Sequence, residues 1–185
     1  MTPGIFTNTD DGQFRLDRYL SRNNVKHVRL TANHLIAQAE SEAGLVTSDT
    51  VVAAPDFGAV GLADDFSQQL ARILDVKELD LTILKKERNL ASANMSRTAG
   101  YLLEANVRGR GVNIRDDRGD SLGTALNSAQ KLKDNGAETI TLSLTHAIHS
   151  GEAGTRLLQA IEAGVVNQVF ITNSRPLTWK KSTLV

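Results

Sequence analysis

The sequence predicts an α/β fold of three layers, in which helices cover both faces of a mainly parallel sheet. Short apolar runs rich in β-branched residues alternate along the chain with longer stretches whose apolar residues recur every three or four positions. This alternation is typical of strand–helix–strand units that build one sheet. A chain of 185 residues is long enough for one domain with a sizeable core. We therefore expect an N-terminal extension at residues 1–24 and a single domain at residues 25–185.

The expected strands are short and apolar, and each is followed by a polar or glycine-containing segment. They cover residues 25–30, 50–54, 79–84, 101–105, 111–116, 138–145 and 167–172.

The expected helices lie between these strands. The clearest covers residues 122–135, because its apolar residues fall on one face: Leu122, Ala125, Leu126, Ala129 and Leu132. Gly136 follows at the position that favours glycine after a helix end. Other helices are expected at residues 34–43, 60–74 and 154–163.

The composition narrows the classes of function. The 21 basic residues balance the 21 acidic residues, so no excess of positive charge supports sequence-independent binding of nucleic acid. Cysteine is absent, which excludes disulfides, thiolate metal sites and cysteine nucleophiles. No apolar run approaches the roughly 20 residues that span a bilayer, and the first residues do not resemble a signal peptide. We expect a cytoplasmic protein without a membrane or nucleic-acid partner.

The most informative segment follows the strand expected at residues 111–116. It contains two adjacent acids, Asp116 and Asp117, and then, where the clearest helix starts, Asp120, Ser121, Leu122, Gly123 and Thr124. Backbone N–H groups at a helix N-terminus bind phosphate oxygens, and hydroxyl side chains add donors. The acids suit the hydroxyls of a sugar, or Mg²⁺ that arrives with a phosphate. The segment is a candidate site for a phosphorylated sugar, and an Asp/Gly turn with a helix cap explains it equally well.

Two other strand ends carry residues suited to phosphates. In PDFGAVG, Asp56 follows a strand and Gly58 permits a tight turn into the next helix. A polyphosphate with its metal fits there, as does an ordinary turn between strand and helix. In KKERN, Lys86 and Arg88 precede a long polar stretch. Two cations on a closing loop can neutralise a migrating phosphoryl group, and a solvated loop is the alternative.

The segment THAIHSG does not predict a nucleophilic site. His146 and His149 lie near Ser150 in the sequence, but no acid is indicated that would complete a base–nucleophile arrangement. Ser150 and Gly151 are instead expected to start the following helix.

Taken together and in order, these segments resemble the C-terminal half of class I ribose-phosphate pyrophosphokinases, which have a phosphoribosyltransferase-like fold of type I. The similarity runs from about residue 25 to residue 178. The pieces that carry it are APDFGAV, Lys86 and Arg88 in KKERN, SANMS, RDDRGDSLGT, LKDNGA, THAIHSG and ITNSRPL. The acidic run alone indicates only the broader phosphoribosyltransferase fold, whereas the further pieces in register indicate the pyrophosphokinases.

The resemblance implies an enzyme that transfers the β,γ-diphosphoryl group of ATP to the 1-hydroxyl of ribose 5-phosphate, or of a related phosphorylated ribosyl acceptor, with Mg²⁺. It implies that Asp116 and Asp117 hold the ribose hydroxyls and that residues 120–124 hold the 5-phosphate. Family members are oligomers, so a homo-oligomer or an association with a related synthetase is expected.

The resemblance also assigns residues to the transferred group and the metal. Lys86 and Arg88 would stabilise the diphosphoryl group during transfer, which depends mainly on positioning and charge neutralisation. Asp56 would help to hold the metal and the ATP phosphates. His34 corresponds to the family's metal-contacting histidine, and a histidine at a helix start is the alternative.

Departures from the family keep other functions open. Family members carry an additional N-terminal domain, with an adenine-binding loop that has no counterpart in this sequence, and Glu87 stands where the family tends to be basic. A phosphoribosyltransferase that consumes phosphoribosyl pyrophosphate would use the same fold and the same acidic run. A non-catalytic subunit that binds sugar phosphate or nucleotide and regulates a full-length synthetase is the third possibility.

Overall fold

The computed structural model describes residues 19, 21–23, 25, 31–86, 101–102, 105–148 and 150–174, with the backbone alone at residues 85, 86, 101 and 102. The chain divides into two compact units, Met1–Thr31 and Ala32–Val185. The strand expected at residues 25–30 lies almost wholly outside the described residues. The extension expected at residues 1–24 stays a prediction.

The second unit is built around a five-stranded sheet. Its strands are β1 (Val51–Ala54), β2 (Leu81–Ile83), β5 (Gly111–Gly119), β6 (Thr139–Ala147) and β7 (Gln168–Ile171). They lie in the order β2–β1–β5–β6–β7, and each neighbouring pair is parallel. The short strands β3 (Lys85–Lys86) and β4 (Tyr101–Leu102) pair antiparallel in a separate two-stranded sheet.

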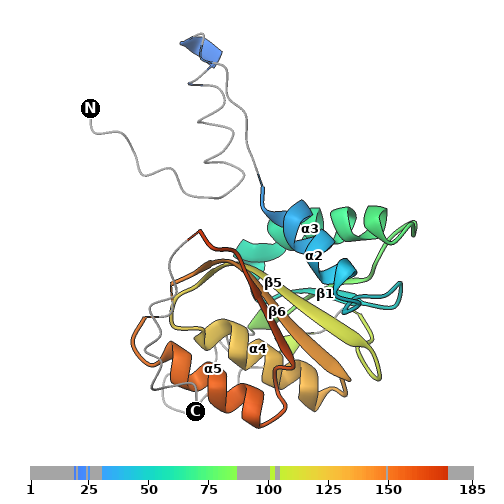
Figure 1. The fold of residues 1–185 in the computed structure, drawn as a ribbon, viewed down its shortest axis with the longest axis vertical. Coiled ribbons are helices and arrows are strands. Elements are labelled where there is room, and N and C mark those ends of the chain that lie inside the picture. The colour runs from blue at the N-terminus through green and yellow to red at the C-terminus, as the bar shows by residue number, and fades with distance from the viewer. Residues whose placement is uncertain are drawn as a thin grey trace, which may run out of the picture. The chain divides into compact units, whose positions relative to one another are not determined.

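Helices cover both faces of the five-stranded sheet (Figure 1). On one face lie α2 (Asn33–Glu42) and α3 (Val60–Ile73), and on the other lie α4 (Gly123–Asp134) and α5 (Ala153–Glu162). A short 3-10 helix, η1 (Phe57–Ala59), joins β1 to α3. This three-layer arrangement confirms the predicted fold class.

The two faces of the sheet are buried in separate apolar cores. Along β1, Val51 and Ala53 pack in the core under α4 and α5, whereas Val52 and Ala54 pack in the core under α2 and α3. Successive side chains of a strand point to opposite faces, so a central strand covered on both sides must be apolar throughout. The uninterrupted run VVAA of β1 is fully buried for this reason.

The structure corrects two expected strands. The strand expected at residues 111–116 continues to Gly119, because β5 stays paired with β6 as far as Arg118 opposite His146 and Gly119 opposite Ala147. Asp117 therefore belongs to the strand, as Asp116 was expected to, rather than to the loop after it. The strand expected at residues 101–105 is reduced to Tyr101–Leu102, which pairs with β3 and does not join the parallel sheet.

The expected helices at residues 34–43, 60–74, 122–135 and 154–163 are confirmed to within one residue at each end. Gly136 adopts a left-handed φ of +89° just after α4, as a glycine after a helix end commonly does. In the part of the chain that the structure describes, no helix has the length and apolar character of a membrane span.

Candidate functional site

The connections of the sheet place a crevice between β1 and β5. From β1 the chain crosses to β2 on one side, and from β5 it continues through β6 to β7 on the other side. In open α/β sheets, ligands bind beyond the carboxyl ends of the strands where the direction of winding reverses in this way. The segments that follow β1 and β5 are PDFGAVG and DSLGT. Two of the segments predicted to bind phosphates are therefore neighbours at the crevice.

Asp56 shapes the loop after β1. Its Oδ1 accepts hydrogen bonds from Gly58 N at 2.9 Å and from Ala59 N at 3.2 Å, so it caps η1. This is the ordinary turn that the sequence left open for PDFGAVG. The side chain is also exposed at the crevice, so capping does not prevent it from meeting a ligand.

Asp116 and Asp117 form a half-buried carboxylate pair at the end of β5. The backbone N–H of Asp117 donates to Asp116 Oδ1 at 2.8 Å. The pKa of Asp116 is raised to about 6, mainly by burial and also by the charges of Asp117 and Asp56, while this backbone hydrogen bond opposes the rise. Three carboxylates therefore share one negatively charged region. A hydroxyl donor or a cation bound there would relieve the repulsion between them.

The loop between β5 and α4 turns sharply at Leu122. Leu122 has a left-handed backbone (φ +59°, ψ +4°), although its side chain is buried in the core at 4% exposure. A residue other than glycine in this conformation is strained, and such strain is often found at ligand sites. No side chain caps the start of α4, and the backbone N–H of Gly123 has a distant contact of 3.5 Å with Ser121 Oγ. The first turn of α4 therefore presents N–H groups suited to an anion.

The segment after β6 holds this loop in place. Ile148 N donates to Gly119 O at 3.0 Å, and Ser150 N donates to Asp120 O at 3.1 Å. Ser150 thus contributes its backbone to the loop and lies before α5, which begins at Ala153 with Glu152 as its N-cap. His146 Nδ1 lies 2.8 Å from Ser174 Oγ. This contact gives His146 a partner other than Ser150. His149 lies outside the described residues.

A buried polar network that the sequence did not predict lies behind the acid pair. Arg115 and Glu40 are both 0% exposed. The Arg115 guanidinium donates to Asn33 Oδ1 at 2.8 Å, to Ser143 O at 3.0 Å, to Thr145 Oγ1 at 2.6 Å and to Asp116 O. Glu40 accepts hydrogen bonds from Asn113 Nδ2, at 2.6 Å, and from Ser143 Oγ. The network therefore joins α2 to the two central strands.

The ionisation of this network follows from its burial. Burial lowers the pKa of Arg115 to about 10, against the opposing charges of Glu40, Asp116, Asp117 and Asp65. Arg115 is therefore protonated at neutral pH. Burial raises the pKa of Glu40, and its hydrogen bonds to Ser143 and Asn113 and the charge of Arg115 oppose that rise. The sequence signal for the network was the alternation of Asn113 and Arg115 with the apolar residues Val112 and Ile114.

The remaining predicted site residues are not brought into this cluster by the described contacts. His34 is exposed on α2, one residue after the buried Asn33. Lys86 lies in β3, where only the backbone is described, and Arg88 lies outside the described residues. Among described residues, no group of three or more His, Cys, Asp or Glu side chains could hold a metal ion.

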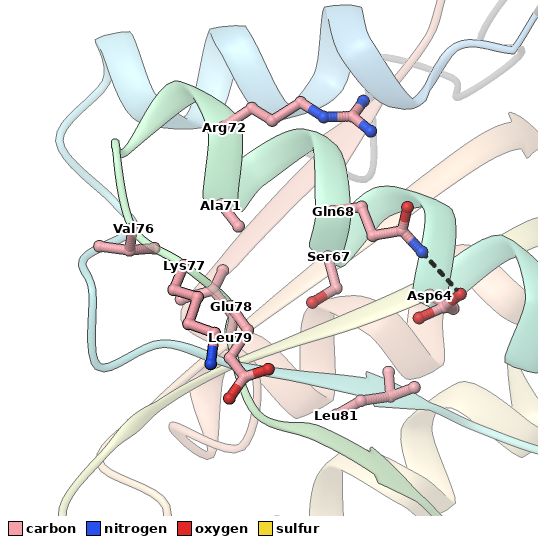
Figure 2. Close-up of a pocket in the computed structure, with 10 residues that line it drawn as sticks. All are labelled: Asp64, Ser67, Gln68, Ala71, Arg72, Val76, Lys77, Glu78, Leu79 and Leu81. Carbon is pink, nitrogen blue, oxygen red and sulfur yellow. Dashed lines mark hydrogen bonds between the residues drawn. The ribbon is translucent and has the colours of Figure 1, made fainter.

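A surface cavity of about 470 Å³ lies away from the crevice (Figure 2). Its wall is one flank of α3 and the segment that leads into β2, and no predicted site residue lines it. Gln68 Nε2 donates to Asp64 Oδ2 at 2.9 Å across its rim. Neither Asp56 nor the acid pair Asp116 and Asp117 lines this cavity.

Gly119, the last residue of β5, has no room for a side chain. A Cβ atom at this position would lie 2.5 Å from Leu144 Cδ1 and 2.8 Å from Leu122 Cδ2. We expect Gly119→Ala to destabilise the protein by about 1–3 kcal/mol, the usual cost of overpacking a core. Urea denaturation measures this effect. Gly61→Ala is the matched control, because a Cβ at Gly61 in α3 meets nothing within 4 Å, and equal stabilities of the two variants would contradict the prediction.

The five-stranded parallel sheet, covered by helices on both faces, defines the class as an α/β protein of three layers, with an acid pair and a strained loop where the winding reverses. The fold is shared with the crystal structure of phosphoribosylpyrophosphate synthetase from Mycobacterium smegmatis, with a TM-score of 0.69 and 24% sequence identity over 92% of this chain and 48% of that chain. In sequence, the chain is a relative of ribose-phosphate pyrophosphokinases. No protein-family model matches it.

The sequence relatives carry this name in several organisms. The chain is 32% identical over 134 residues to ribose-phosphate pyrophosphokinase of Wolinella succinogenes, and these aligned residues make up 72% of this chain and 38% of the relative. It is 35% identical over 131 residues to that of Bordetella pertussis, which covers 71% of this chain and 37% of the relative. These matches confirm the family resemblance predicted from the motifs. The chain matches well under half of the length of these relatives.

Proposed function

We propose that this chain binds ribose 5-phosphate, or a related phosphorylated ribosyl acceptor, and takes part in transferring the diphosphoryl group of ATP to the 1-hydroxyl of that sugar. The observation that carries the proposal is the acid pair of β5 beside the uncapped start of α4 at the crevice. The similarity to proteins named ribose-phosphate pyrophosphokinase supports the reaction.

The two parts of the loop would bind the two parts of the acceptor. Asp116 and Asp117 would accept hydrogen bonds from the ribose hydroxyls, because carboxylates are strong acceptors for such donors. The backbone N–H groups of residues 120–124 would donate to the 5-phosphate oxygens, aided by the hydroxyls of Ser121 and Thr124 and by the positive end of the helix dipole. The acids would thus face the hydroxyl end of the sugar, and the amides would face its phosphate end.

The crevice also suits Mg²⁺. Mg²⁺ prefers oxygen ligands and is usually bound by one or two carboxylates together with substrate phosphates. Asp56 and the acid pair supply three carboxylates at the crevice, and after burial the charges of Asp117 and Asp56 raise the pKa of Asp116, so the donor chemistry fits. We propose Asp56 as the protein ligand of Mg²⁺, with His34 as a second candidate, and the ion would neutralise phosphate charge.

In the transfer, the 1-hydroxyl oxygen of the acceptor forms a bond to the β-phosphorus of ATP, the bond from that phosphorus to the oxygen bridging the α-phosphorus breaks, and AMP leaves. The hydroxyl proton passes to solvent or to a nearby base. We propose that Lys86 and Arg88 stabilise the diphosphoryl group during this step, as cations do in phosphoryl transfer. Because the chain matches only part of its relatives, a second copy or a related synthetase is proposed to complete the ATP site.

The test is AMP release from ATP, measured in a coupled assay with and without ribose 5-phosphate and Mg²⁺. AMP release that requires both supports the proposal. Binding of ribose 5-phosphate without turnover, even at high enzyme concentration, would instead favour the non-catalytic subunit. Pyrophosphate release from phosphoribosyl pyrophosphate with a nucleobase would favour a phosphoribosyltransferase.

A further inference from the structure

The strongest unexplained feature of the domain is the buried arginine directly before the acid pair. Burying a charged group is costly even when it is paired, and apolar residues of similar size are often as stable or more stable in its place. On β1, the strand next to β5, the positions on this face are the apolar residues Val52 and Ala54. The fold therefore does not require an arginine at this position, and the presence of Arg115 calls for another explanation.

The guanidinium is directed at the carboxyl ends of the two central strands. It donates to Asp116 O at the end of β5, and to Ser143 O at 3.0 Å and Thr145 Oγ1 at 2.6 Å near the end of β6. Asp116 O belongs to the peptide group that joins Asp116 to Asp117. One rigid group thus ties the backbone of the acid pair to the neighbouring strand.

The rest of the network fixes the guanidinium itself. Its Nε donates to Asn33 Oδ1 at 2.8 Å, and Asn33 Nδ2 donates to Leu62 O at 3.0 Å and to Asp65 Oδ2 at 2.6 Å. The ring of Phe66 lies with its centroid 5.8 Å from Arg115 Cζ, within the range of a cation–π contact. Contacts with residues of α2 and α3 therefore restrict the orientation of the guanidinium.

We propose that Arg115 is a positioning residue: it holds the peptide between Asp116 and Asp117 in the geometry that binds a ribosyl phosphate and places a positive charge beside the two carboxylates. This role rests on the proposed function of the loop. It explains why a planar group with several donors stands at this position, since it bonds three acceptors on two strands at once. The ammonium of lysine would keep the positive charge but would lose the planar arrangement of several N–H donors.

The test compares binding with stability in matched variants. Isothermal titration calorimetry with ribose 5-phosphate and Mg²⁺ would be run on the wild type, Arg115→Met, Arg115→Lys and Leu70→Ala. Leu70 is 0% exposed in the same core layer and lies outside the network, so Leu70→Ala reports the effect of lost stability alone. We expect binding about tenfold weaker, or about 1.4 kcal/mol, in Arg115→Met, partial recovery in Arg115→Lys, and wild-type affinity in Leu70→Ala. Equal affinities in Arg115→Met and the wild type would overturn the proposal.

A second pair of variants covers the case in which Arg115→Met does not fold. Thr145→Val removes one acceptor of the guanidinium with little change of shape, and Thr145→Ser keeps it. Of these two variants, we expect only Thr145→Val to weaken the binding of ribose 5-phosphate. Hydrogen exchange of the ligand-free proteins then separates this proposal from the proposed function. Faster exchange at the amides of residues 116–119 in Thr145→Val, but not in Thr145→Ser or Leu70→Ala, supports positioning by Arg115. This holds even if the wild type fails to bind the sugar. Unchanged exchange at these amides in Thr145→Val refutes the positioning role.

Discussion

Asp117→Ala is expected to weaken the binding of ribose 5-phosphate about 100-fold while leaving the protein folded. A hydrogen bond to a charged group contributes about 1.5–3 kcal/mol, and loss of the carboxylate removes such bonds to the ribose hydroxyls, so a change of about 2.7 kcal/mol corresponds to this factor. Stability should fall little, because removing Asp117 also removes a charge that repels Asp116. Calorimetric titration and thermal unfolding of the same sample measure both quantities.

The control for this prediction is Asp49→Ala. Asp49 is an exposed acid whose Oδ1 lies 2.9 Å from Arg110 Nε, just before the start of β1 and away from the carboxyl ends of the strands. Its loss should leave the affinity for the sugar unchanged. If Asp117→Ala instead lowered the melting temperature without changing the affinity, the acid pair would be a structural turn and not a sugar site.

Asp116→Asn is expected to stabilise the protein at pH 7.5 while weakening its binding of the sugar. The pKa of Asp116 is about 6 in the folded protein, raised from 3.8 first by burial, so the folded state holds the proton more tightly than the unfolded state does. The stability contributed by this group is complete below pH 3.8 and is lost as the pH rises through 6. Asparagine carries no charge, and at pH 7.5 the gain should be on the order of 2 kcal/mol.

Calorimetric melting at pH 7.5 and pH 4 tests this sign. The variant should melt several degrees higher than the wild type at pH 7.5, and the two should differ little at pH 4. Asp120→Asn, at an exposed position of the same loop, should show no such gain. A lower melting temperature of Asp116→Asn at pH 7.5 would contradict the prediction, because it would show that the ionised carboxylate stabilises the fold. A gain in stability at a ligand site would agree with the usual conflict between stability and function.

The elements could be predicted because their signals are local. The stripe of α4 and the glycine that follows it are read within a few turns of helix, and the apolar run of β1 reports burial on both faces. The position of the acid pair before a helix start was also predictable, because α4 begins at Gly123 as its apolar stripe indicates, whereas the binding of a phosphate there stays a prediction. The length of β5 was not predictable, because whether residues 117–119 continue the strand depends on pairing with β6.

The network behind the loop could not be predicted from neighbouring residues. Asn33 bonds Arg115 across 82 positions of the chain, and Ser143 bonds Glu40 across 103. A charged residue in a strand ordinarily predicts an exposed face, because burial is unfavourable unless partners are present. Here the partners come from α2 and β6, and the sequence alone does not show that they meet.

By itself the sequence determined the class of the fold, the order of its elements and which donors and acceptors residues 116–124 can offer, because periodicity, turn residues and the donor or acceptor character of a side chain are carried by short stretches of chain. Only the tertiary structure decided that the loop after β1 adjoins the loop after β5, that Leu122 adopts a left-handed backbone, and that Arg115 is buried and bonded behind the acid pair. These features depend on which distant segments pack together. Packing of remote segments is the one property that no local pattern contains.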